Sequence, residues 1–290
     1  MSKHGNDARP LTSDPSYDSF WPKPSPDQTH ILFVRTPAGI HDRDYSKATT
    51  WIMNSDGGAV RQLLGLGVYG WTIQGHPEWR PNGKMVAMFG GQRTNPQIFL
   101  VRADGTAPVR LTSDGRGGPR PGSNTDPSWH PDGQSLLFVG CPIALCWPAN
   151  QEIYRINADG NGEERLTQDS IPDYDPYYSP NSSGSGGTIA WLRNTGNLRF
   201  AIFRMNVDGS GQTAVIDDGG INSKPEWLPD SLKIYFHRIP PGSATDSKFN
   251  IWRVRPDGSD LHELVVPRPN YVNEHPAVVF PQRGQPDQGK

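Results

Sequence analysis

The sequence has no long apolar segment. Its longest apolar runs, such as 136–139 and 278–280, are far shorter than the roughly 20 residues that a membrane-spanning helix needs. An excess of one charge is missing too, because 28 basic and 30 acidic side chains leave a formal net charge of −2. We therefore expect no transmembrane segment and no nucleic-acid partner, since no overall field would attract a polyanion. The polar N-terminus lacks the apolar core of a signal peptide.

Cysteine is scarce: the sequence contains two, Cys141 and Cys146. Two thiols this close in a turn-rich segment could form a local disulfide, which is typical of an oxidising compartment, or remain two free cysteines. A zinc site would need more thiols, or histidines at zinc spacing, and the sequence offers neither.

Common catalytic motifs are absent as well. The sequence contains no Gly-x-Ser-x-Gly elbow, no phosphate-binding loop and no dinucleotide-binding Gly-x-Gly-x-x-Gly after a strand. No stretch of ten residues has the periodicity of an amphipathic helix. We therefore expect no accompanying hydrolase domain with a nucleophile elbow and no nucleotide-binding loop of these two kinds.

Glycine and proline are abundant. The 32 glycines and 29 prolines make up about a fifth of the chain, against roughly 12% in ordinary proteins. Nine Trp, nine Tyr and ten Phe supply the large apolar groups that a disordered chain lacks. The composition therefore predicts a folded protein with many turns.

A repeat of about fifty residues organises the chain. One turn motif, of the form Trp-x-Pro-Asp-Gly, recurs around five prolines at spacings of 55, 50, 49 and 49 residues: Pro26, Pro81, Pro131, Pro180 and Pro229. A second motif, of the form Asn-x-Asp-Gly, recurs around five aspartates at spacings of 48, 55, 49 and 49 residues: Asp56, Asp104, Asp159, Asp208 and Asp257. Short β-rich runs flank both turns, so each repeat predicts four strands.

Repeats of forty to fifty residues with four strands each are typical of a β-propeller. We therefore predict an all-β fold, a single β-propeller domain over 1–290. Its five complete four-stranded repeats cover approximately 15–66, 67–114, 115–169, 170–218 and 219–266. Residues 8–12 match an outermost strand and 274–280 an innermost one, which predicts a split or incomplete sixth blade.

The motifs resemble the WD-repeat-like propeller modules of the TolB family. The resemblance is carried by Trp129-His-Pro-Asp-Gly133, Ile156-Asn-Ala-Asp-Gly160 and Leu166-Thr167, and copies of the pattern run from about residue 8 to 280. Members of such families include scaffolds, sugar-acid lyases and propellers attached to peptidases, so the fold does not fix the function. The resemblance implies a periplasmic or extracellular location, with which a cysteine pair agrees.

One position in each repeat is expected at the mouth of the central channel. It is the residue before the first proline of the innermost strand: Trp21, His76, Asp126, Asp175, Lys224 and His275. In TolB-like modules an aspartate here serves the local backbone, which is the structural interpretation of Asp126 and Asp175. Together with His76 and His275 they could instead bind calcium, manganese or zinc, although no cofactor is certain.

A second group of candidates lies at the ends of middle strands. Arg35, Arg193 and Arg238 occupy equivalent positions, with His237 beside the last of them. Three guanidinium groups on one face would suit a carboxylate or phosphate, whereas the alternative is that the arginines are solvated and each pairs with a nearby loop. Trp71 and Tyr271 belong to a set of loop aromatics that could bind a ligand or cap the core.

Two functions follow. The first is a monomeric, non-enzymatic propeller that binds a protein, peptide or other ligand through its long-loop face and central funnel. The alternative is a metal-assisted lyase or hydrolase acting on an acidic saccharide. In a lyase His76, His275 or Lys224 would act as the base while the three arginines neutralise the substrate carboxylate.

Overall fold

The computed structural model describes residues 10–112, 123–141, 150–183, 186–196, 199–228, 230–243 and 248–264. These residues form strands and turns, with two three-residue 3₁₀ helices, η1 (His41–Arg43) and η2 (Tyr45–Lys47). Among them no helix is long and apolar enough to cross a membrane. The prediction of an all-β fold is therefore confirmed.

The strands fall into five four-stranded units, one for each predicted repeat. The first unit contains β1 (Tyr17–Pro24), β2 (His30–Pro37), β3 (Thr49–Asn54) and β4 (Arg61–Leu64). The second contains β5 (Ile73–Trp79), β6 (Met85–Gln92), β7 (Asn95–Arg102) and β8 (Val109–Arg110). The third contains β9 (Asn124–Trp129), β10 (Ser135–Gly140), β11 (Glu152–Asn157) and β12 (Glu164–Arg165). The fourth contains β13 (Asp173–Tyr178), β14 (Thr188–Gly196), β15 (Arg199–Asn206) and β16 (Thr213–Ile216). The fifth contains β17 (Ile221–Trp227), β18 (Ile234–Ile239), β19 (Asn250–Val254) and β20 (His262–Glu263).

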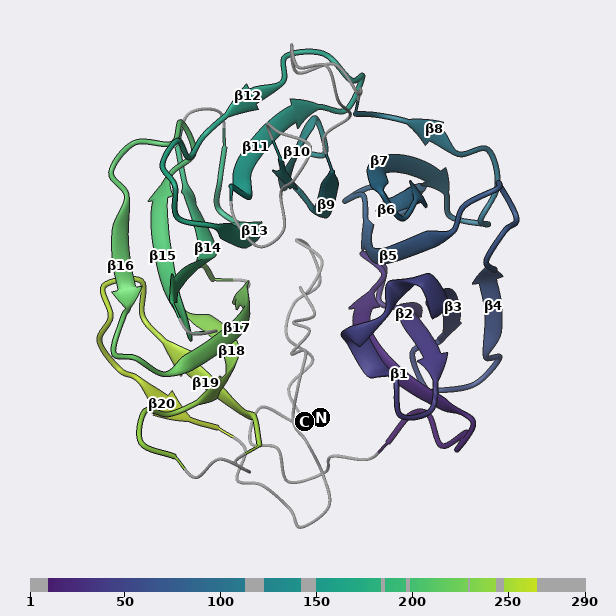
Figure 1. The fold of residues 1–290 in the computed structure, drawn as a ribbon, viewed down its shortest axis with the longest axis horizontal. Helices are drawn as coiled ribbons and strands as arrows, with labels where there is room; N and C mark the ends of the chain where they lie inside the picture. The colour runs from purple at the N-terminus through teal and green to yellow at the C-terminus, as the bar shows by residue number, and fades with distance from the viewer. Residues whose placement is uncertain are drawn as a thin grey trace.

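Each unit is an antiparallel meander in which consecutive strands pair. A single parallel bridge between Phe200 and Ile221 joins the fourth unit to the fifth. Figure 1 shows the units arranged around a centre, with β5, β9, β13 and β17 facing inward and β4, β8, β12, β16 and β20 at the rim. We refer to these units as blades one to five.

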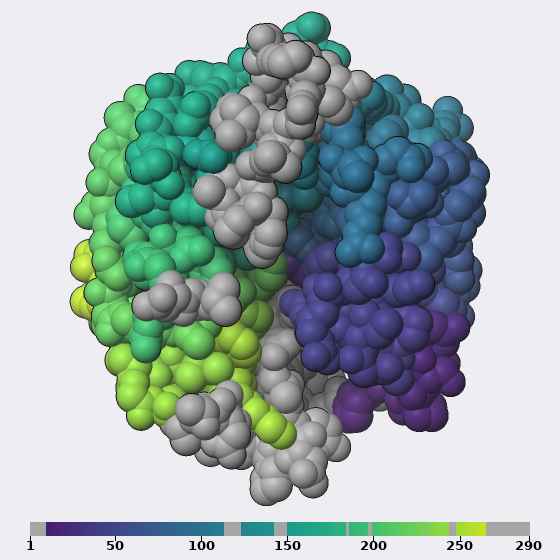
Figure 2. Space-filling view, viewed as in Figure 1, coloured from purple at the N-terminus to yellow at the C-terminus, as the bar shows by residue number. Residues whose placement is uncertain are grey.

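Side chains of alternating direction fill the space between blades. Leu136 and Phe138 of β10 pack toward the second blade, whereas Leu137 and Val139 of the same strand pack with Trp191 of the fourth. This two-residue alternation buries both faces of β10, which explains why its sequence is apolar without interruption. Figure 2 shows the first repeat (purple) in close contact with the second (blue), and the third to fifth repeats (teal to yellow) in close contact with one another.

The Asn-x-Asp-Gly turns pack closely against the preceding blade. Gly105 has φ +86°, and a Cβ atom there would lie 2.6 Å from the carbonyl oxygen of Leu63 in the preceding blade, so the turn needs glycine. At Gly57 the corresponding carbonyl belongs to Leu11, at 3.2 Å. Leu11 therefore lies where the outer strand of a preceding blade would end, although residues 10–12 form no strand. The other predicted remnant, 274–280, lies outside the described residues, so the sixth blade stays a prediction.

Cys141 follows the last residue of β10 and is buried. It is disulfide-bonded. The other cysteine of the sequence, Cys146, lies outside the described residues.

Candidate functional site at the centre of the ring

The same backbone distortion occurs in the innermost strand of every described blade. The register of each pair of inner strands shifts at a residue that precedes proline. These residues have positive φ: Trp21 (54°), His76 (48°), Asp126 (51°), Asp175 (47°) and Lys224 (53°). Left-handed backbone is unfavourable for residues other than glycine, and such bulges re-aim side chains. We call these five residues the inner ring; the sixth candidate, His275, lies outside the described residues.

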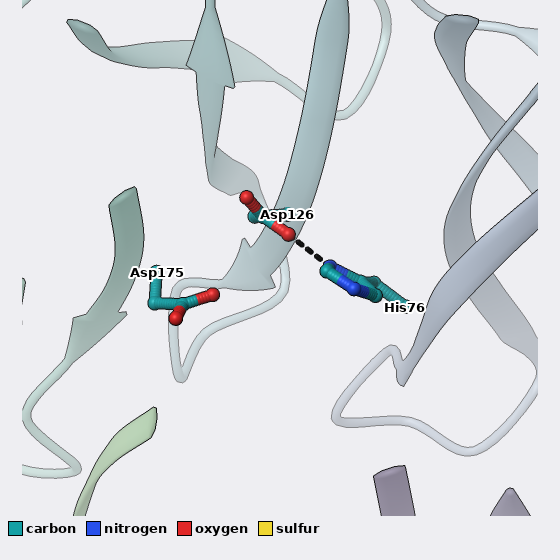
Figure 3. A group of neighbouring side chains, drawn as sticks. All are labelled: His76, Asp126 and Asp175. Carbon is teal, nitrogen blue, oxygen red and sulfur yellow. Dashed lines mark ion pairs between the residues drawn. The ribbon is translucent and has the colours of Figure 1, made fainter. Parts of the chain in front are cut away.

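The inner-ring side chains contact one another in sequence. The Lys224 ammonium donates to Asp175 Oδ1 at 2.8 Å and lies 3.5 Å from the centroid of the Trp21 ring. The Trp21 and His76 rings are 4.0 Å apart between centroids. His76 Nδ1 is paired with Asp126 Oδ1, and Figure 3 shows Asp175 lying beside this pair. Side chains from five blades thus form one polar and aromatic cluster.

Tyr45 closes the cluster from the loop between β2 and β3. Its hydroxyl accepts a hydrogen bond from Trp21 Nε1 at 2.8 Å and lies 2.6 Å from His76 Nε2. Because the indole N–H is the donor, the tyrosine proton is left to bond His76 Nε2. Gly75 provides the room, since a Cβ atom there would lie 2.6 Å from Tyr45 Cδ1. Both imidazole nitrogens of His76 are therefore engaged inside the protein.

The charges of the cluster shift one another's protonation. Burial alone would raise the pKa of Asp126, but the adjacent His76 and the Lys224 charge hold it below its usual value. Burial and the neighbouring Asp126 charge raise the pKa of Asp175, even though Lys224 opposes the change. Burial also raises the pKa of Tyr45 well above 10. Tyr45 therefore stays protonated and is no candidate base.

A second layer of polar side chains lies below the inner ring. Its members come two residues after the inner-ring residue of the same strand. Lys23 Nζ lies 2.9 Å from Glu78 Oε2, is paired with Glu226 and donates to the Tyr177 hydroxyl at 3.3 Å. Burial alone would lower the pKa of Lys23, but the two carboxylates raise it well above its usual value. A small pocket, on the order of one water molecule in size, separates the layers. Its lining includes Trp21, His76, Asp126, Lys23, Glu78 and Tyr177.

Tyr45 and this second layer were not predicted from the sequence. The signal for Lys23, Glu78 and Glu226 was present, because residues i and i+2 of a strand share a face. Tyr45 had no such signal, since the loop between the second and third strands differs in length and sequence from repeat to repeat.

The three candidate arginines are buried in separate places. Arg193 Nε and Nη2 donate to the carboxylate of Asp173 at 2.8 and 2.9 Å. Arg238 Nη1 donates to Asn222 Oδ1 at 2.7 Å, and its Nη2 is paired with Asp218. Arg35 donates to Ser19 Oγ at 3.2 Å and lies over the Trp51 ring. Each arginine thus pairs within its own blade or the loop before it, as the alternative stated above expects, but all three side chains are buried and not solvated. Their role as a shared ligand site stays a prediction.

The other candidate ligand-binding residues are His237, Trp71 and Tyr271. His237 is buried against Phe249, and burial together with the Lys224 charge lowers its pKa to about 3, so it is neutral at pH 7. Trp71 is buried and packs on Phe99 at 4.5 Å between ring centroids, so it caps the core and is not an exposed ligand platform. Tyr271 lies outside the described residues.

Among the residues that the structure describes, two groups of side chains have the donor atoms for a metal ion. In the inner ring His76, Asp126 and Asp175 offer ligand atoms within 4.8 Å of one another, so they could hold one. The Lys224 ammonium, 2.8 Å from Asp175, already places a positive charge there and opposes a divalent ion. As arranged, the inner ring fits an ammonium group better than a metal. The second group, Glu152, Asp169 and Asp173, lies between the third and fourth blades.

This seam between the blades contains two buried carboxylates. Glu152 accepts from Thr167 Oγ1 at 2.6 Å and is paired with Arg165, while Asp173 is held by Arg193. Burial raises the pKa of Glu152 to about 7, although Thr167 and Arg165 oppose the change. One blade earlier the same position is the neutral Gln97, which accepts from Thr112 and Asn124.

Five meandering four-stranded units around a shared centre, each aiming one side chain at it, define a β-propeller with a candidate site on its axis. Residues 68–277 match the family described as the TolB beta propeller domain. The chain belongs to this family.

Individual proteins are similar to parts of this chain. The uncharacterized protein Atu1656 of Agrobacterium fabrum is 27% identical over 138 residues, which is 47% of this chain and 41% of that protein. The chain therefore spans less than half the length of this relative. A TolB candidate from Agrobacterium tumefaciens has a similar fold, with TM-score 0.69 and 21% identity, covering 89% of this chain and 83% of that one. An oligogalacturonate lyase in complex with manganese has TM-score 0.57 and 15% identity, covering 88% and 68%. These structural likenesses establish the fold and leave the function open.

Proposed function

We propose that the chain is a non-enzymatic binding propeller whose partner, a protein, peptide or other ligand, binds at the inner ring and the long-loop face around it. The engagement of His76 carries this proposal. One imidazole nitrogen bonds Tyr45 and the other pairs with Asp126, while the Lys224 ammonium donates to Asp175. Groups committed in this way are poor acceptors for a substrate proton, which favours binding over catalysis.

The backbone supports the same proposal. Five residues other than glycine hold a strained conformation that directs their side chains to one place. Strain of this kind clusters at functional sites, because the surrounding fold must maintain it. We place this activity in the periplasm or outside the cell, as the family resemblance and the disulfide of Cys141 favour.

Site-specific photo-cross-linking in the native organism tests the proposal. A photoreactive residue replaces Asp42, which lies in η1 beside the inner ring and whose side chain is 42% exposed. The control replaces Leu232, exposed in the β17–β18 turn on the opposite face. A specific adduct at position 42 and none at 232 supports the proposal. Equal labelling at both positions, or at neither, contradicts it.

A metal-assisted lyase or hydrolase acting on an acidic saccharide is the second candidate. The three donors His76, Asp126 and Asp175 favour it, since such a reaction needs a positive group to neutralise a carboxylate. The test incubates the protein with oligouronates, with and without manganese or calcium, and follows the ultraviolet absorbance of an unsaturated product. Turnover that is lost in His76→Ala would establish the lyase and refute the binding proposal.

A further inference from the structure

The ammonium group of Lys224 contacts residues of other blades. The stem of this side chain comes from β17, but its ammonium group contacts Asp175 of β13 at 2.8 Å and the Trp21 ring of β1 at 3.5 Å. The charge of this ammonium group also lowers the pKa of Asp126 of β9. An aromatic face combined with carboxylates is a general way to recognise an organic ammonium ion.

Negative charge exceeds positive charge around this ammonium group. The carboxylates of Asp42, Asp126 and Asp175 all interact with Lys224. The second layer below adds Glu78 and Glu226 against the single ammonium of Lys23. His237 also lies within the reach of the Lys224 charge and is neutral at pH 7. The centre of the described ring therefore favours a cation from a partner over an anion.

We propose that Trp21, Asp126 and Asp175 form an ammonium cage, occupied in the free protein by its own Lys224, into which a partner inserts a primary ammonium group such as a lysine side chain. This inference rests on the proposed function, because it names the chemistry by which the partner engages the inner ring. The partner's ammonium replaces that of Lys224, which moves toward Asp42. An indole face suits an organic ammonium ion better than a hard metal ion, which prefers a full shell of oxygen ligands.

Partly exposed side chains of the loop between β2 and β3 lie within electrostatic reach of the cage. The side chains of Asp42 and His41, from the loop between β2 and β3, are 42% and 32% exposed. The Asp42 carboxylate is hydrogen-bonded to His41 and senses the charge of Lys224. It can therefore receive the displaced lysine and maintain its charge balance.

Chemical rescue of Lys224→Ala tests the cage. The variant lacks the stem and the ammonium group, and propylammonium has the length to replace both. We expect propylammonium to raise the thermal stability of the variant and to bind it at least about tenfold more tightly than it binds the wild type, measured by calorimetry. The neutral 1-propanol tests whether charge matters, and we expect it to bind at least about tenfold more weakly than the amine.

The matched control is Lys233→Ala, which removes a lysine paired with Asp260 at 3.0 Å near the β17–β18 turn. Propylammonium should leave this variant unchanged. Equal binding of amine and alcohol to Lys224→Ala, or equal rescue of the control, overturns the cage. Adding Trp21→Leu to Lys224→Ala should remove most of the amine binding, and retention of full affinity would likewise refute it.

A second variant keeps the proposal testable if Lys224→Ala does not fold. Lys224→Met keeps most of the stem and leaves room only for ammonium itself. Ammonium chloride should stabilise this variant more than sodium chloride at the same ionic strength, and equal stabilities would overturn the proposal. None of these outcomes depends on the natural partner, so a failed cage remains distinguishable from a failed cross-link at position 42.

Discussion

Replacing Glu152 by glutamine should change how the stability of the propeller depends on pH. The Glu152 side chain is fully buried and its pKa is raised to about 7, against an ordinary value of 4.5. The folded protein thus binds this proton more tightly than the unfolded chain does. The stabilising contribution is complete below pH 4.5 and disappears as the pH rises through 7.

The linkage relation gives the magnitude. Between pH 5.5 and pH 8 a carboxyl group with these two pKa values loses about 2 kcal/mol of folding free energy. Glutamine does not titrate, and Gln97 shows that the fold accepts it at the equivalent position one blade earlier. Glu152→Gln should therefore gain about 2 kcal/mol relative to the wild type when the pH is raised from 5.5 to 8.

Urea unfolding followed by tryptophan fluorescence at both pH values measures this difference. Glu164→Gln is the control, because Glu164 belongs to β12 but its side chain is 51% exposed. The control should follow the wild type at both pH values. A Glu152→Gln protein whose stability changes with pH as that of the wild type does would refute the argument that Glu152 titrates near neutral pH.

Two further substitutions test the centre of the ring. Lys23→Met leaves Glu78 and Glu226 buried without their shared ammonium group, and we expect a loss of about 3–5 kcal/mol in urea unfolding, partly recovered by adding Glu78→Gln. An unchanged midpoint would contradict the buried network. Gly75→Ala places a Cβ atom 2.6 Å from Tyr45 Cδ1 and should destabilise the protein by about 1–3 kcal/mol. If its stability and its tyrosine spectrum match those of the wild type, Tyr45 does not pack as described.

Repetition explains which parts of the site could be predicted. The residue before proline recurs once in each repeat, so the equivalence of Trp21, His76, Asp126, Asp175 and Lys224 could be read directly from the spacing. Their contacts could not, because a distance across the ring depends on how all the blades pack. The pairing of Lys224 with both Asp175 and Trp21 is a contact of this kind, since it joins residues 49 and 203 positions apart.

The arginines show a signal that was overlooked. Their equivalent strand positions were read from the sequence, but their partners Asp169 and Asp218, in the loops before β13 and β17, were not. These two aspartates are 49 residues apart, which is the spacing of the repeat, so their equivalence was present in the sequence. Tyr45 has no such signal, because the loop between the two middle strands differs in length and sequence from repeat to repeat.

The left-handed bulges of the inner ring have a thermodynamic consequence. Glycine adopts this conformation without penalty, whereas each of the five side chains present costs on the order of 1 kcal/mol. Indole, imidazole, carboxylate and ammonium groups stand at these positions instead, so every described blade bears this conformational cost and keeps a functional side chain at the centre of the ring.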